Sequence, residues 1–131
     1  MSRREIREQI FLILFRREFY AQEDFPEQIA LFAEDLGEKP PEDLAYIENK
    51  ITQIEKNLSE IDKAVNDSAK KWKTTRMGKV ELAIIRLAVY EMRYEDAIPV
   101  SVAINEAVEL AKKYGGEESP GFVNGILAKL A

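Results

Sequence analysis

The chain has 131 residues, of which 46% are hydrophobic and 33% are charged, and its formal net charge is −5. This length and mixed composition predict a small soluble helical protein with one domain or two small subdomains. The acidic balance argues against generic nucleic-acid binding, and the absence of cysteine and histidine excludes disulfides, thiol nucleophiles, imidazole bases and nearly all zinc sites.

The first predicted helix runs from about Arg3 to Tyr20. Its apolar residues recur at the spacing of one helical face, so this side is expected to pack on the core. Those residues are Ile6, Ile10, Ile13 and Leu14, with Phe11 and Phe15 flanking them. Arg3 and Arg7 are four positions apart on a different face, where the helix is expected to offer guanidinium groups.

An apolar run from Ile10 to Phe15 lies within this predicted helix. It is far shorter than the about 20 residues that span a membrane. Acids precede the run and Arg16-Arg17 follow it, which is not the pattern of a secretion signal. We therefore expect no membrane partner, and a cytoplasmic location is the simplest interpretation.

Prolines and a glycine divide the following segment. Pro26 opens a second predicted helix, Gly37 closes it, and Pro40-Pro41 then breaks the chain. From Leu44 to Val65, apolar residues alternate every three and four positions. That pattern is typical of one long coiled-coil helix, but it also fits two helices separated by a kink.

We favour two helices over one in this segment. A break near Asn57-Leu58-Ser59 fits because Ser59, followed three residues later by Asp62, resembles a capping box with a shorter acid. Two helices would also suit a compact domain better than one long helix.

Residues 70 to 79 form a basic cluster that contains no acid. Its cations are Lys70, Lys71, Lys73, Arg76 and Lys79. On an acidic body such a cluster can bind phosphate locally, but lysines of this kind also serve simply to solubilise a loop, and composition leaves both open. Trp72 is the only tryptophan of the chain, and we expect it to pack at this junction rather than to stack on a base.

The sequence pattern of the C-terminal part predicts three more helices. The first spans Gly78 to Tyr94 and carries apolar residues well beyond one stripe, so it should be central. The next starts at Pro99 with Ser101 as a capping hydroxyl and ends at Gly115-Gly116, since glycine accepts a left-handed C-cap. Ser119-Pro120 begins the last helix. No strand-like alternation is sustained.

The sequence gives little support for catalysis. Its acid pairs are Glu34-Asp35, Glu42-Asp43, Glu95-Asp96 and Glu117-Glu118. Each pair lies at a predicted helix end or turn, where solvated acids are ordinary, and no histidine is present to act as base or ligand. We expect no enzyme, no cofactor and no metal site. A DNA-reading helix-turn-helix is also disfavoured, because Glu106 and Glu109 would face DNA with the wrong charge.

Four stretches of the sequence resemble the NusB family of transcription antitermination factors. They are SRREIRE near the start, IIRLAVYEMRYEDAIP, VAINEAVELAKKYG, and SPGFVNGIL near the end. The resemblance implies an all-α fold of about seven helices in two packed small helical bundles. It predicts a single NusB-like domain over residues 1–131, with an N-terminal bundle over 1–70 and a C-terminal bundle over 71–131.

The resemblance also implies a function. NusB proteins bind boxA, a short single-stranded RNA element, jointly with the ribosomal protein NusE. The pair acts in the RNA polymerase antitermination complex and supports ribosomal RNA transcription. Family members occur as monomers or dimers, so the resemblance is compatible with a homodimer.

Site residues follow from the same resemblance and from the basic clusters. The arginine-rich start is expected to contact RNA phosphates, the aromatic of FVNG to approach RNA bases, and the acid before it to make a polar contact to a base. The expected RNA-binding residues are Arg3, Arg4, Arg7, Lys79, Glu118 and Phe122. Glu81, on the fifth predicted helix, is expected to contact NusE.

Two rival interpretations remain open on the sequence. The chain could be a helical adaptor that binds proteins and no RNA. It could also be a fragment of an RNA methyltransferase, because a NusB-like domain recruits RNA in some of these enzymes.

Overall fold

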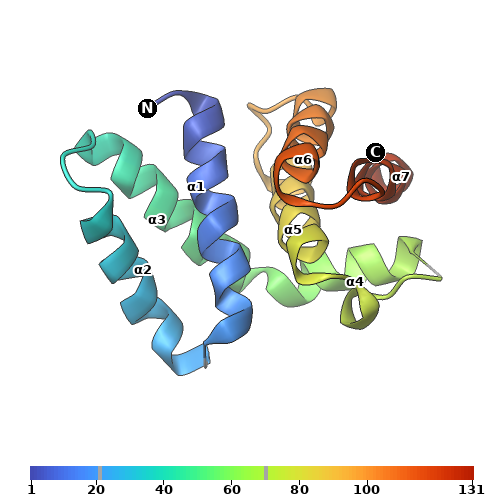
Figure 1. The fold of residues 1–131 in the computed structure, drawn as a ribbon, viewed down its shortest axis with the longest axis horizontal. Coiled ribbons are helices and arrows are strands. Elements are labelled where there is room, and N and C mark those ends of the chain that lie inside the picture. Colours follow the sequence, from blue (N-terminus) through green and yellow to red (C-terminus); the bar gives the residue numbers. More distant parts are fainter. Residues whose placement is uncertain (21, 70) are drawn as a thin grey trace. The chain divides into compact units, whose positions relative to one another are not determined.

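The computed structural model of the protein describes residues 1–20, 22–69 and 71–131. Within these ranges the chain forms seven α-helices and three short 3₁₀ turns with no strand, so the predicted all-α fold is confirmed (Figure 1). The helices divide into two compact units, Met1–Glu55 and Lys56–Ala131. This boundary lies earlier than the predicted one between residues 70 and 71. Lys70 itself lies outside the described residues.

Three helices build the first unit: α1 (Arg3–Arg16), α2 (Phe25–Asp35) and most of α3 (Pro41–Lys56). The first helix is shorter than predicted because the chain tightens into 3₁₀ turns at Arg17–Phe19 and Gln22–Asp24. The predicted inner face of α1 is buried at Ile10, Phe11, Ile13 and Leu14. No helix in the described ranges is long and apolar enough to cross a membrane.

Polar contacts connect both ends of α1 to α3. The Met1 amino group donates a hydrogen bond to Asp43 Oδ2 at 3.0 Å, near the start of α3. Arg17, just beyond α1, donates through Nε to Glu55 near the end of α3. These contacts fix the direction of α1 within the first unit.

A tight turn joins α2 to α3. Gly37 lies in this turn with φ of 64°, the only positive φ among the described residues. A side chain is disfavoured in that conformation, which explains why glycine ends α2 as predicted. The two helices form a hairpin (Figure 1).

The favoured break after α3 is confirmed. A helix ends at Lys56, and α4 (Leu58–Ser68) begins immediately after Asn57. The predicted capping box at Ser59 is wrong, because Asn57 precedes the helix and makes no side-chain cap. Asp62 has a different role: both of its carboxylate oxygens accept hydrogen bonds from Arg86, at 2.9 and 2.8 Å.

The second unit is organised around α5 (Lys79–Tyr94), as the sequence predicted. Every residue from Leu82 to Glu91 is buried. The helices that pack on α5 are α4, α6 (Val100–Tyr114) and α7 (Ser119–Leu130). The predicted cap at Ser101 is wrong, because α6 starts after Pro99 without a side-chain hydrogen bond.

Removing the carboxylate of Asp62 should destabilise the second unit. Arg86 is only 8% exposed, so Asp62→Asn removes the negative charge that offsets a buried guanidinium. We expect Asp62→Asn to lower the free energy of unfolding by about 2 kcal/mol in urea denaturation. The matched control is Asp67→Asn on the same helix, whose ion pair with Lys63 is exposed and should cost less than about 0.5 kcal/mol. Equal losses in the two variants would contradict this account.

Candidate functional site

The start of α1 holds two exposed arginines, Arg3 and Arg4, in a capped first turn. Ser2 Oγ accepts a hydrogen bond from the Glu5 backbone N–H at 3.1 Å, and the Ser2 N–H donates to Glu5 Oε1 at 3.3 Å. These hydrogen bonds from Ser2 hold the pKa of the Glu5 carboxyl below its usual value. The turn is therefore ordered, and Glu5 stays ionised beside the two cations at neutral pH.

Arg7 does not extend this exposed surface. Its side chain is only 9% exposed and already makes an interaction within the protein. The expectation that α1 offers both Arg3 and Arg7 to solvent is therefore wrong for Arg7. Periodicity placed the two on one face, but tertiary packing covers the second position.

The start of α5 carries Lys79, which is exposed, and Glu81, which is partly exposed. A Cβ on Gly78 would lie 3.0 Å from Glu81 Oε1, so glycine leaves room for this carboxylate. Glu81 lies in the first turn, where the positive end of the helix dipole favours an anion. The carboxylate thus has room beside Gly78 and keeps access to solvent.

The loop between α6 and α7 is shaped by close packing at Gly115. The predicted left-handed conformation is wrong, since Gly115 has φ of −97° and ψ of −179°. A Cβ at this position would instead lie 2.4 Å from Ser119 Oγ and 2.9 Å from the Ala111 carbonyl oxygen. Ser119 is buried, and its Oγ accepts a hydrogen bond from the Gly116 N–H at 3.1 Å.

This packing presents the two candidate RNA contacts of α7. Glu118 is exposed directly before the helix, and Phe122 is partly exposed one turn later. The Phe122 N–H donates to the Glu118 carbonyl oxygen at 3.1 Å. Both side chains therefore project from the same helical turn.

Trp72 contacts Phe122, although the two are far apart in the sequence. Their ring centroids are 6.0 Å apart and the ring planes are perpendicular. The indole is 47% exposed and lies inside the second unit, so the prediction that it packs at the connection between two bundles is wrong. Sequence reasoning missed this pairing, and the only available signal was a lone tryptophan within a run of cations.

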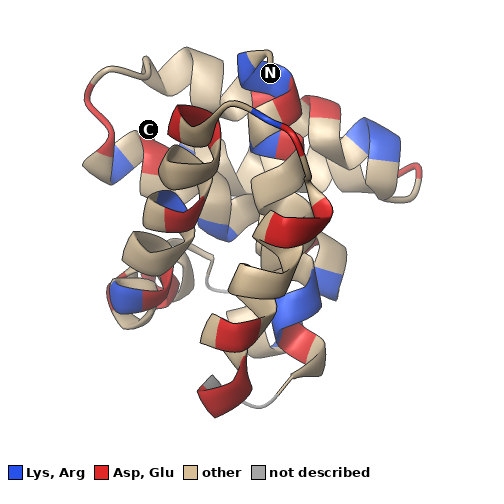
Figure 2. Cartoon of the chain, turned by 90° about the vertical axis from the view of Figure 1, so that its left-hand side faces the viewer, with Lys and Arg blue, Asp and Glu red and all other residues tan. Residues whose placement is uncertain are grey.

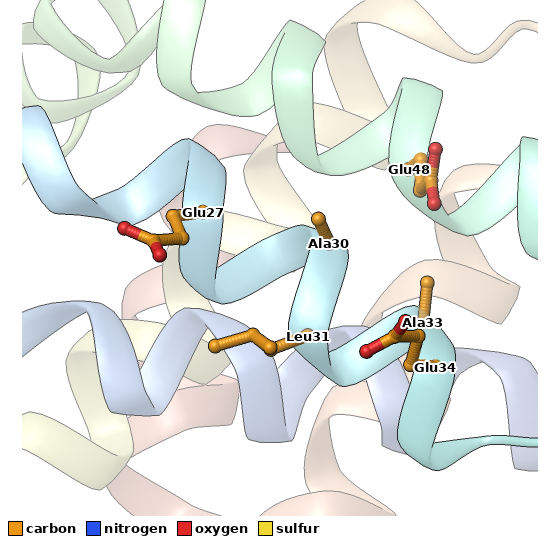
Figure 3. A pocket seen from close by; sticks show the side chains of 6 residues that line it. All are labelled: Glu27, Ala30, Leu31, Ala33, Glu34 and Glu48. Atoms are coloured by element: carbon orange, nitrogen blue, oxygen red, sulfur yellow. The ribbon is translucent and has the colours of Figure 1, made fainter.

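A pocket in the first unit is lined partly by acids and does not suit a phosphate group. An open pocket of about 550 Å³ in the first unit is lined by five residues of α2 and by Glu48 of α3 (Figure 3). Glu27 and Glu34 add two further carboxylates, and none of the described lining residues is basic, so the pocket would repel phosphate. Within the described residues no group of three or more acids is arranged to hold a metal ion.

The predicted site residues thus fall into separate groups. Figure 2 shows acidic and basic residues interspersed along the same helices in that view. In the second unit, Glu118 and Phe122 share one helical turn, and Lys79 and Glu81 share another. The N-terminal arginines belong to the first unit.

Comparison with known proteins identifies relatives over the full chain. The NusB family matches residues 4–131. The transcription antitermination protein NusB of Agathobacter rectalis is 50% identical over 131 residues, covering 100% of both chains. The structure of T. maritima NusB has a TM-score of 0.90 at 38% identity, covering 100% of this chain and 91% of that one. A structure of antitermination factors NusB and NusE in complex with dsRNA has a TM-score of 0.84 at 25% identity, covering 96% and 92%.

Substitution of Gly115 should disturb the loop that presents Glu118 and Phe122. We expect Gly115→Ala to lower the free energy of unfolding by about 2 kcal/mol, because the new methyl group would overlap Ser119 and the backbone of Ala111. Gly116→Ala is the matched control, since a Cβ there meets nothing within 4 Å. Thermal denaturation of both variants compares them directly. Equal stability of the two would show that close packing does not set the identity of residue 115.

Proposed function

Since the chain belongs to the NusB family, we propose that it is a transcription antitermination factor that binds boxA-type single-stranded RNA together with the ribosomal protein NusE. In this role it supports ribosomal RNA transcription within the RNA polymerase antitermination complex. The family is one of antitermination factors rather than enzymes. The observation that carries the RNA and NusE parts of the proposal is the likeness to a NusB solved with NusE and dsRNA, and the single-stranded boxA element is proposed from the family.

The geometry supplies the groups that single-stranded RNA requires. Cations bind phosphates, and flat rings stack on bases. Arg3 and Arg4 are exposed in an ordered turn, and Phe122 is partly exposed beside Glu118. We assign the arginines to phosphates, the ring to a base, and the Glu118 carboxylate to a base amino group.

Two further cations, Lys79 and Arg7, complete the proposed RNA contacts, and we expect them to contribute unequally to RNA affinity. Lys79 is exposed at the start of α5 and suits a phosphate contact. Arg7 is buried, so its guanidinium would reach RNA only after its side chain moves. We therefore expect Arg7 to contribute less than Arg3 and Arg4.

The start of α5 is the proposed contact for NusE. Glu81 is a partly exposed carboxylate beside Gly78, in the first turn of α5, and such a charge can pair with a cation on a partner. We further propose that the two units act as one NusB-like domain in the cytoplasm and that a homodimer is compatible with this role.

The rival is a helical adaptor that binds proteins and no RNA. It would need neither exposed arginines at the start of α1 nor a partly exposed aromatic at Phe122. RNA binding therefore separates the two proposals, and the first measurement is fluorescence anisotropy of a labelled boxA-type RNA. A scrambled RNA serves as control. Preference for boxA that strengthens with NusE supports antitermination, and no preference in either case favours the adaptor.

Loss of the exposed arginines should weaken RNA binding in a salt-dependent way. We expect Arg3→Ala with Arg4→Ala to lower affinity for the boxA-type RNA and to reduce the slope of log affinity against log salt by up to ~0.7 per lost phosphate contact. Arg93→Ala, which removes an exposed cation from the last turn of α5, is the matched control. An unchanged salt slope in the double variant would remove these arginines from the RNA site.

Loss of the Glu81 carboxylate should weaken partner binding but not RNA binding. We expect Glu81→Gln to reduce affinity for NusE roughly three- to tenfold in calorimetric titration, because an interfacial charge pair is lost. Glu109→Gln removes an exposed acid of α6 that pairs with Lys112 and is the control. NusE affinity that is equal in both variants would place the partner surface elsewhere.

A further inference from the structure

We propose that Trp72 and Phe122 together form a stacking site for unpaired nucleobases, with Trp72 as its main exposed ring. The inference rests on the proposed RNA-binding function and adds a contact to it. The occupant is a single-stranded segment of RNA whose bases lie against the rings while its phosphates face the neighbouring lysines.

The ring geometry leaves stacking faces open. The centroids lie 6.0 Å apart with an interplanar angle of 90°, which is an edge-to-face arrangement. In such a pair one ring contributes its edge, so at most one ring face is covered by the partner. With 47% of Trp72 exposed, the indole remains accessible to a base. Every base has a π face, so an exposed indole can stack on any of them.

The residues that follow Trp72 are anchored to the protein. Thr74 is buried. Asn66 holds these residues: its Oδ1 accepts from the Thr74 N–H at 2.8 Å, and its backbone oxygen accepts from Lys73 Nζ at 2.8 Å. Exposure alone would be ordinary for a single aromatic, but Trp72 lies against a second, partly exposed ring at Phe122, so the two rings form one aromatic surface.

Charge selects nucleic acid over a peptide as the occupant. Lys71 and Lys73 flank Trp72 and are exposed, and no acid occurs between residues 71 and 79. Interleaved cations and aromatics are what single-stranded RNA needs, since phosphates and bases alternate along it. Tyr94 offers a contrast: it is 43% exposed and stacks on Tyr90 at 5.3 Å, but acids follow it in the sequence.

The variants are Trp72→Ala, Trp72→Phe and the control Tyr94→Ala, which removes a similarly exposed and paired aromatic of the same unit. Each is titrated with the boxA-type RNA and with an unrelated single-stranded RNA by anisotropy across a salt series. We expect Trp72→Ala to weaken binding between about fivefold and a hundredfold with an unchanged salt slope, because stacking releases no counterions. Trp72→Phe should stay within about threefold of the unmodified protein.

A second readout does not depend on the folding of any variant. Trp72 is the only tryptophan, so intrinsic fluorescence of the unmodified protein reports on this ring alone. We expect quenching that saturates at the same RNA concentration as the anisotropy. RNA binding without a fluorescence change, or equal affinity of Trp72→Ala and Tyr94→Ala, would overturn the proposal. Loss of NusE affinity in Trp72→Ala with RNA affinity intact would also overturn it and assign the ring to a protein partner.

The outcomes separate this inference from the proposed function. BoxA-specific binding that is independent of Trp72 would leave the antitermination role standing and reject the stacking site. Binding that depends on Trp72 but is equal for the boxA-type and unrelated RNA would support the stacking site and reject boxA recognition by the protein alone.

Discussion

The second unit depends on the burial of α5 on all sides. A helix that is shielded at every position from Leu82 to Glu91 needs neighbours around its circumference, and within the second unit α4, α6 and α7 pack on it. A buried charge is tolerated only when it is paired, so Arg86 on this helix requires Asp62 on α4. The ion pair therefore fixes α4 against the central helix.

The lack of room for a side chain at Gly115, rather than its backbone torsion angles, determines the loop before α7. Small residues at Ala103, Ala107 and Ala111 are buried along α6 and allow its neighbours to approach closely. Gly115 continues that series, because the Ser119 side chain occupies the volume where a Cβ would stand. The buried serine then orders the turn that presents Glu118 and Phe122. The close packing of Gly115 against Ser119 thus also determines how the exposed residues at the start of α7 are presented.

The helices could be predicted from sequence because apolar periodicity is a property of one segment, as the continuous burial of α5 shows. The side-chain caps could not, since the hydrogen-bond partner of a serine or an acid depends on the fold: Asp62 pairs with Arg86, and the expected cap at Ser59 does not form. The same limit applied at the site. Burial of Arg7 depends on tertiary packing, and no local pattern indicated the contact of Trp72 with Phe122.

An acidic protein with local cations can still bind RNA selectively. The salt concentration sets how far each charge acts. Charges act over a Debye length of about 10 Å at 0.1 M salt, so at physiological ionic strength a phosphate beside Arg3 or Lys71 responds to that cation and little to acids further away. At low salt the net charge of −5 repels RNA from the surfaces that lack such cations. Stacking on exposed rings is insensitive to salt. Affinity shared between a few cations and aromatic rings is therefore a physical means to favour one unpaired RNA segment over the many phosphates of folded RNA.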